Sequence, residues 1–382
     1  MNKHNKQGRL LYGITEKNAD LLYVLPVMLP DPAIWMEHSS RKIAVVGRFE
    51  VQRVRRQMPD NTAVYSFSEV LHKYQQYADD GRDTDAVAVI AAISRAWGLD
   101  EWLVSSDFPF ETAQKLMDKG LHLKTVREFH FERRCKSAVE VKHIKQSVKL
   151  AEGGMQHAFD IVKAADISSD HTLTWRDTPL TSEILRGEIN AHIALHGGTA
   201  EHTIAACGAQ AADPHECGSG ALKANEPIVI DIFPRDDKTG YHGDLTRTIV
   251  KGTAPEYLKG VYSAVQKAKT AAIEKARQGI PAKQLHSAAQ KILDNSGFHT
   301  DINSQPPTGF IHGLGHGLGL EVHEVPAVNS RNDSPLATGN VITIEPGLYY
   351  PGWGGVRLED VIVIEEKGCK NLTTIATVLE IP

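Results

Sequence analysis

The sequence predicts an α+β chain with two domains, a smaller N-terminal α/β domain over residues 1–135 and a larger C-terminal domain over residues 136–382. Three observations support this. Short apolar runs alternate with helical patterns up to about residue 134, an amphipathic helix pattern begins at Ser137, and from there the order helix, helix, strands occurs twice. A length of 382 residues is also typical of two domains.

The N-terminal part alternates two kinds of segment. KIAVVGRF and EWLVSSDF are typical of buried strands, whereas AVAVIAAISRAWGL and ETAQKLMDKG have the composition and spacing of helices. The basic cluster FERRC at 131–135 ends this alternation. We therefore expect a domain boundary near residue 135.

The C-terminal part contains an internal repeat of helices and strands. Ser137 and Glu140 have the spacing of a capping box, and a second helix pattern, TSEILRGEINAHIALHGG, ends at two glycines. The second half begins with Pro255 at a helix start and adds PAKQLHSAAQKILDNSG. The apolar face of the first helix consists of Val141, Ile144, Val148, Ala151, Met155, Phe159 and Val162.

Four acids occupy matching places in the two halves. Asp231 in PIVIDIF and Glu345 in VITIEPG both follow apolar strand residues and are 114 residues apart, and Asp244 and Glu359 on the following strands are 115 residues apart. Burying unpaired carboxylates costs several kcal/mol per ion, so cations should compensate these four. Two metal ions about 3.5–4 Å apart would do so and could activate a water.

Histidines are concentrated in the same region, since ten of the 18 fall between His192 and His323. Three of them lie in FIHGLGHGLGLEVHE, residues 310–324, as His312, His316 and His323. The interleaved glycines disfavour a helix and allow close backbone approach, which predicts a curved, extended strand. On such a strand His312 and His316 share one face, and His323 lies on the other unless a bulge or turn intervenes.

Other polar patterns are better explained by ordinary structure. His192 and His196 have the i, i+4 spacing of zinc-binding helices but lack the glutamate of HExxH, so we interpret them as a plain helix face. The run Arg53, Arg55 and Arg56 is expected on the solvated surface. No GxSxG elbow is present.

Composition and charge exclude several classes of protein. With 42 basic and 47 acidic residues the net charge is −5, which offers no attraction to nucleic acid or to an anionic membrane. The start of the chain has no apolar run typical of a leader, and no stretch of about 18 apolar residues occurs, so we expect a cytoplasmic protein. The four cysteines show no CxxC spacing and are expected to be reduced, structural thiols.

Five segments in this order, VIDIF, GDLTRT, HGLGHGLGLEVHE, ITIEPGLYY and GGVRLED, resemble the signature segments of the pita-bread metallopeptidases, specifically the prolidase and aminopeptidase P branch. The resemblance covers about 245 residues from residue 137 onward, and the set of five is highly specific. It implies a C-terminal pita-bread domain with an internal pseudo-twofold repeat and a curved antiparallel sheet. It also implies a smaller, creatinase-like N-terminal α/β domain.

The resemblance implies a dinuclear metal centre. Its ligands would be Asp231, Asp244, His316, Glu345 and Glu359. In this arrangement Asp244 and Glu359 bridge the two ions, Asp231 holds one of them, and His316 with Glu345 holds the other. Such an oxygen-rich set suits Mn²⁺, with Co²⁺, Zn²⁺ or Fe²⁺ as alternatives.

The implied reaction is hydrolysis of the peptide bond between an N-terminal residue and proline. Glu345 would be the base for the attacking water and His323 would stabilise the oxyanion. His215 and His312 match the family's substrate-side histidines. Arg357, on the same strand face as Glu359, would order the ligand set.

Two features and two alternatives remain open at this stage. The separation of 13 residues from Asp231 to Asp244 is slightly longer than usual in the family, which leaves the local substrate contacts open. Arg331 could pair with a free substrate carboxylate and favour Xaa-Pro dipeptides over longer Xaa-Pro peptides, although a surface role is equally compatible. Two alternatives to an Xaa-Pro peptidase exist on the same fold. One is a metal-free, creatinase-like C–N hydrolase, and the other is a non-catalytic binding protein. The family resemblance also suggests a homodimer.

Overall fold

The computed structural model describes residues 7–79 and 85–382. Residues 1–6, which belong to the segment examined for a leader, lie outside the described residues. It divides into two compact units, Met1–Phe131 with Lys238–Gly240, and Glu132–Asp237 with Tyr241–Pro382. The ranges predicted from sequence, 1–135 and 136–382, differ from these units at the boundary and by the short later segment. In the described part of the chain, no helix is long and apolar enough to cross a membrane.

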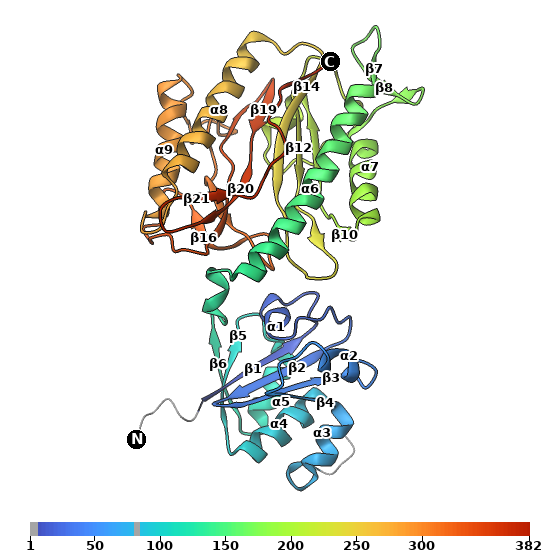
Figure 1. Cartoon of the computed structure of the whole chain (residues 1–382), viewed down its shortest axis with the longest axis vertical. Helices are drawn as coiled ribbons and strands as arrows, with labels where there is room; N and C mark the ends of the chain where they lie inside the picture. Colours follow the sequence, from blue (N-terminus) through green and yellow to red (C-terminus); the bar gives the residue numbers. More distant parts are fainter. Residues whose placement is uncertain (1–6, 80–84) are drawn as a thin grey trace. The chain divides into compact units, whose positions relative to one another are not determined.

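The first unit is built on a six-stranded mixed sheet of order β4-β3-β2-β1-β5-β6 (Figure 1). Its antiparallel pairs are β1 with β2 and β2 with β3, and its other pairs are parallel. The strands are β1 Gln7–Gly13, β2 Ala33–His38, β3 Arg41–Val46, β4 Thr62–Ser66, β5 Glu101–Ser105 and β6 His122–Val126. The segments predicted as strands contain β3 and β5.

Both faces of this sheet are covered, because alternate residues of its strands enter two separate apolar clusters. Ile34 and Met36 of β2 pack in one cluster, whereas Ala33 and Trp35 pack in the other. The first cluster includes residues of α3, α4 and α5, and the second includes residues of α1 and α2. The helices are α1 Ala19–Val24, α2 Val51–Arg55, α3 Phe67–Lys73, α4 Ala86–Trp97 and α5 Phe110–Asp118, with short 3₁₀ turns at Gln75–Tyr77 and Phe131–Arg134.

The second unit begins with the predicted long helix. Ser137 and Glu140 form both hydrogen bonds of a capping box, and the helix extends for 27 residues. Pro255 and Pro281 stand immediately before the first residues of two further helices, where a proline lacks no needed donor. The helices are α6 Ala138–Ala164, α7 Ser182–Leu195, α8 Glu256–Lys275 and α9 Ala282–Asn295.

Two sheets and a hairpin pack against these helices, and Figure 1 shows α8 and α9 on one side of the view and α6 and α7 on the other. The first sheet has the order β11-β12-β14-β22 and the second the order β16-β15-β17-β20-β21. The first consists of β11 Ile204–Cys207, β12 Ile228–Ile232, β14 Leu245–Lys251 and β22 Glu380–Ile381. The second consists of β15 Gly315–Gly317, β16 Glu324–Val328, β17 Val341–Ile344, β20 Asp360–Ile364 and β21 Cys369–Asn371.

Smaller elements complete the unit. The hairpin consists of β18 Gly347–Tyr350 and β19 Gly354–Arg357, which pair antiparallel. The others are β7 Asp166–Ile167, β8 Leu173–Trp175, β9 Thr178–Pro179, β10 Gly198–Thr199, β13 Arg235–Asp236 and a 3₁₀ turn at Gly208–Ala212.

Each half has its own apolar core. The first core combines α6 and α7 with β11, β12 and β14, and the second combines α8 and α9 with β17 to β20. This is the pseudo-twofold, curved-sheet arrangement of the pita-bread fold. The halves are joined directly, since the Glu359 N–H donates to the Thr246 carbonyl at 3.1 Å and the Arg357 N–H to Thr248 Oγ1 at 3.0 Å. This junction brings the strand ends that carry the four acids together.

Candidate active site

The acids lie at or beside the ends of neighbouring strands. Asp231 is the fourth residue of β12, and Asp244 immediately precedes β14. Glu345 immediately follows β17, and Glu359 lies between β19 and β20. His316 is the central residue of the short strand β15.

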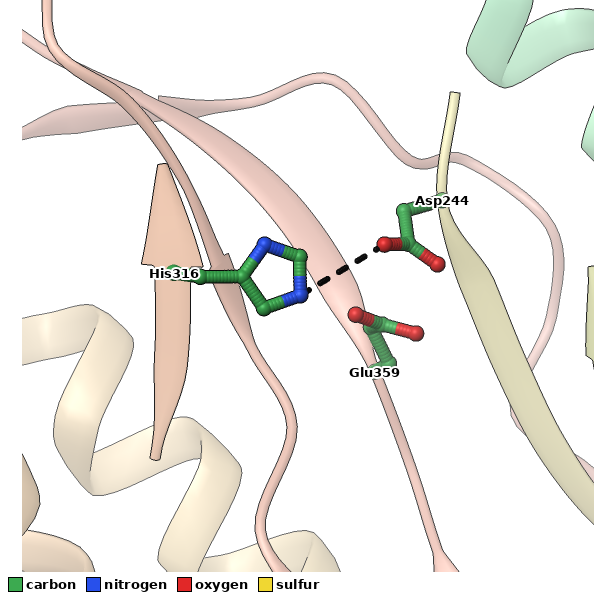
Figure 2. Close-up of side chains that lie close together, drawn as sticks. All are labelled: Asp244, His316 and Glu359. Atoms are coloured by element: carbon green, nitrogen blue, oxygen red, sulfur yellow. Dashed lines mark ion pairs between the residues drawn. The ribbon is translucent and has the colours of Figure 1, made fainter. Parts of the chain in front are cut away.

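Three of these side chains point toward one another, as Figure 2 shows for Asp244, His316 and Glu359. Each offers one ligand atom, and these three atoms lie within 4.8 Å of one another. His316 Nε2 lies 3.7 Å from Asp244 Oδ2 and 3.2 Å from Glu345 Oε1. The sequence prediction that acids from both halves meet at one imidazole is thus consistent with the geometry.

Asp231 is connected to this group through a threonine and an arginine. Thr246 Oγ1 lies 2.7 Å from Asp231 Oδ1 and 2.9 Å from Glu359 Oε2. Because a hydroxyl has one proton, it can donate to only one of these two carboxylates at a time. Arg357 donates from Nη2 to Asp231 Oδ2 at 2.7 Å and from Nε to Thr246 Oγ1 at 3.1 Å.

The cluster holds more negative charge than its own cations balance. Burial, together with Glu359 and Asp231, raises the pKa of Asp244 well above its usual range. Burial and the neighbouring charges of Glu345 and Asp231 likewise raise the pKa of Glu359 to about 8. Carboxylates whose pKa is raised by neighbouring carboxylates mark a place short of positive charge, so this donor set fits divalent cations.

Glu345 and His316 form an ion pair in which each side chain favours the charged form of the other. Burial alone would raise the pKa of Glu345, but the hydrogen bond from His316 and its charge lower it to about 2. Burial opposes the charged form of His316, yet the contact with Glu345 raises its pKa to about 9. Thr343 adds a hydroxyl 3.2 Å from Glu345 Oε1.

The glycine-rich segment differs from the predicted single curved strand. Only Gly315–Gly317 is strand, its pairing with β16 shifts register there, and bends follow at residues 319–323. A Cβ on Gly315 would lie 2.1 Å from the Thr343 carbonyl oxygen, which explains the glycine. His323 follows the predicted exception, because these bends intervene and its ring centroid lies 4.4 Å from that of His316.

The other predicted residues beside the acids are held by a short hydrogen-bonded chain. His312 Nε2 lies 2.9 Å from the Tyr349 hydroxyl, and Arg357 Nη1 donates to the same hydroxyl at 2.9 Å. Arg357 Nη1 also donates to the Pro214 carbonyl at 3.2 Å, next to His215. Burial lowers the pKa of both His312 and His323, which favours neutral imidazoles.

The acids, His316 and the other predicted residues beside them line one cavity of about 820 Å³. It brings together the five predicted metal ligands with His215, His312, His323 and Arg357. The complete lining is His202, Ile204, Pro214, His215, Cys217, Asp231, Phe233, Asp244, Ile311, His312, Gly313, Gly315, His316, Val322, His323, Glu345, Arg357 and Glu359.

Sequence reasoning missed several of the lining residues. His202 could have been found, because it precedes Asp231 by 29 residues, the same separation as that of His316 from Glu345. Phe233, Ile311 and Val322 carry no chemical signal in the sequence and supply apolar surface beside the polar groups. Cys217 also lines the cavity, and it is a free thiol like the other three cysteines.

Two predicted features lie away from the cavity. Arg331 is exposed in a turn where its N–H donates to Asn329 Oδ1, and it does not line the cavity, so the structure does not bring it to a substrate carboxylate. The long connection from Asp231 to Asp244 contributes Phe233 and Asp244 itself to the lining, and none of residues 234–243. His192 lies on α7 and His196 is the C-cap residue of that helix, and their rings are stacked.

Comparisons with known proteins agree with this geometry. The model of metallopeptidase family M24 matches residues 142–366, more than half of the chain. An Xaa-Pro dipeptidase of Pyrococcus furiosus is 41% identical over 172 residues, which cover 45% of this chain and 47% of the relative. The chain thus spans about half the length of that curated relative.

Solved structures resemble the whole chain. The prolidase of Pyrococcus horikoshii superposes with a TM-score of 0.78 at 26% identity, covering 99% of this chain and 97% of the other. An X-Pro aminopeptidase of Thermotoga maritima gives a TM-score of 0.80 at 22% identity, covering 97% of each chain.

Proposed function

Because the chain belongs to metallopeptidase family M24, we propose that it is a metal-dependent exopeptidase that cleaves the bond between an N-terminal residue and a following proline. One observation carries the proposal: four carboxylates and one imidazole from both halves of the second unit line a single cavity. The names of its relatives, Xaa-Pro dipeptidase and X-Pro aminopeptidase, support the substrate class.

The proposed metal ligands are Asp231, Asp244, His316, Glu345 and Glu359. Asp244 and Glu359 would lie between two ions, with Asp231 on one side and His316 with Glu345 on the other. Mn²⁺ is the proposed metal, with Co²⁺, Zn²⁺ and Fe²⁺ as substitutes, because four carboxylates favour hard cations. Bound ions would supply Lewis-acid polarisation of the scissile carbonyl and a lowered pKa for water.

The chain's own residues have separate proposed roles. Glu345, ionised and lining the cavity, accepts the proton of the attacking water. His323 donates to the oxyanion as the carbonyl carbon becomes tetrahedral. His215 and His312 contact the substrate, and His312 is oriented by the Tyr349 hydroxyl. Arg357 keeps Asp231 in place through its 2.7 Å contact.

Substrate length and assembly are separate questions within this proposal. The absence of Arg331 from the cavity lining removes the argument from that residue for a dipeptide preference, so both Xaa-Pro dipeptides and longer Xaa-Pro peptides are proposed substrates. A homodimer stays a prediction from the family, which light scattering of the purified chain can test.

The test is to remove metal with a chelator and then titrate Mn²⁺ while measuring bound metal and turnover together. We expect no turnover without metal, recovery as the metal binds, and cleavage of Xaa-Pro but not of a matched Xaa-Ala dipeptide. A tripeptide Xaa-Pro-Xaa, measured beside the dipeptide, gives the length preference. Two outcomes would contradict the proposal. Hydrolysis at the same rate with and without metal would favour a creatinase-like hydrolase, and failure to rebind metal without any turnover would favour a binding protein.

A further inference from the structure

A second polar cluster is buried directly behind the acids, on the opposite face of the strands that carry them. Successive strand residues point to opposite faces, so Thr246 meets the acids while Arg247 points away, and Asp360 follows Glu359 in the same manner. Arg247, Asp360 and Lys269 are at most 6% exposed. None of the three lines the cavity, so none can contact substrate there.

Arg247 lies at the centre of this cluster. Its Nη1 donates to the Glu359 carbonyl at 2.5 Å and to the Thr246 carbonyl at 3.0 Å. Its Nη2 donates to Asp360 Oδ1 at 3.0 Å and to the Ile375 carbonyl at 3.1 Å. One guanidinium therefore joins the first half's strand β14 to the backbone of a proposed bridging ligand in the second half.

Lys269, on α8, shares only part of these contacts. Its Nζ donates to Asp360 Oδ2 at 2.6 Å, and the Asn371 amide donates to the same oxygen at 3.0 Å. No hydrogen bond joins Lys269 to Glu359 among the described residues. The two cations are thus both buried partners of Asp360, but of these two only Arg247 has a described hydrogen bond to the backbone of Glu359.

We propose that Arg247 is a positioning residue for the metal centre, which fixes the backbone of Glu359 at the junction of the two halves so that its carboxylate stays beside Thr246 and Asp244. This inference rests on the proposed metal-dependent function. A planar guanidinium can serve several acceptors at fixed angles, whereas an ammonium on a flexible stem cannot. Loss of such a partner behind a ligand typically weakens metal binding about 10–100-fold.

The test compares Arg247→Gln with Lys269→Gln, since each removes one buried cation from Asp360. The readout is the Mn²⁺ dissociation constant of the purified chain, measured by competition with a chelating dye, beside the thermal melting of the metal-free protein. We expect Arg247→Gln to weaken Mn²⁺ binding about 10–100-fold. Lys269→Gln should lower the melting temperature but change the dissociation constant by less than about threefold.

Arg247→Lys keeps the charge and tests the geometry, and it also answers the question if Arg247→Gln does not fold. We expect it to bind Mn²⁺ more weakly than the wild type and to regain near wild-type turnover at saturating Mn²⁺, because the groups facing the substrate are unchanged.

Three outcomes would overturn the inference. Equal weakening by Arg247→Gln and Lys269→Gln would assign the effect to charge alone, and wild-type affinity in Arg247→Lys would show that the fixed geometry is not needed. If the wild type itself bound no Mn²⁺, the proposed function would fall first and the inference with it.

Discussion

The two halves of the second unit carry matching acids, but among the described residues only the second half places an imidazole nitrogen within 4 Å of their carboxylates. Val229 and Thr343 are 114 residues apart, and Ala206 of β11 lies opposite Val229. At the matching place His316 of β15 lies beside Thr343, whose hydroxyl accepts the His316 N–H at 3.0 Å. The repeat therefore explains the four carboxylates, and a difference at one position makes the cluster asymmetric.

A second difference concerns the cation that holds each strand-end acid. Asp231 of the first half is held by Arg357, which comes from the second half. The residue 115 positions before Arg357 is His242, whose backbone N–H donates to the Gly319 carbonyl at 2.8 Å. Asp231 of the first half thus has an arginine, a permanent cation, as its partner. Glu345 of the second half has His316 as its partner instead.

The largest expected effect tests the acid of the second half. Glu345→Gln keeps the shape but removes the proposed base, so kcat for an Xaa-Pro dipeptide should fall by about 10²–10⁴. Circular dichroism should show an unchanged fold, and Glu366→Gln, at an exposed position, is the matched control. Normal turnover in Glu345→Gln would refute the assigned base.

The cation that holds the first half's acid, Arg357, should matter most for stability. Arg357→Met leaves the buried Asp231 carboxylate without its ion pair, so the free energy of unfolding of the metal-free protein should fall by about 3–5 kcal/mol. Urea denaturation measures it. The exposed Arg331→Met should change the same quantity by less than about 0.5 kcal/mol. Equal effects from both would mean that Arg357 does not hold the acid.

The imidazole that breaks the symmetry can be removed by itself. His316→Ala makes the second half resemble the first at this place, and we expect Mn²⁺ affinity to fall by about 100-fold, the upper end for groups that support a metal site. Isothermal titration calorimetry gives the affinity and the number of ions bound. His196→Ala, exposed on α7, should bind as the wild type does, and unaltered binding by His316→Ala would exclude the residue as a ligand.

The smallest effects compare one threonine from each half. Thr246 contacts Asp231, Glu359 and Arg357, whereas Thr343 contacts Glu345 and the His316 N–H. Thr246→Val should lower the free energy of unfolding by about 1–3 kcal/mol, because buried groups lose their partner, and Thr343→Val by about 1 kcal/mol. Urea unfolding in chelator measures both, and the reverse order would show that the halves are equivalent here.

The fold and the acids were predictable because their signals are local or periodic. Ser137 with Glu140 and the prolines at 255 and 281 marked helix starts that the structure contains. The offsets of 114 and 115 residues identified acids that the structure brings to one cavity.

The remaining site residues could not be predicted from the sequence for physical reasons. Thr246 and Tyr349 are ordinary residues of apolar strands. Their importance comes from contacts with residues distant in sequence, since Thr246 contacts Glu359, 113 positions away, and Tyr349 contacts His312, 37 positions away. The sequence left the face of His323 dependent on a bulge or turn, and the bends after Gly317 that bring it to the site depend on tertiary packing. Arg331 lies between two site residues in sequence, but its turn faces solvent.

The pairing of β14 with β22 has a consequence for synthesis of the chain. Val250 and Lys251 in the first half pair with Glu380 and Ile381, which are made 130 residues later. Arg357, whose guanidinium pairs with Asp231, is likewise made 126 residues after that acid. A nascent chain that has completed only its first half therefore has an unpaired sheet edge and an uncompensated acid, and we expect this half to reach its native packing only after β22 has been made.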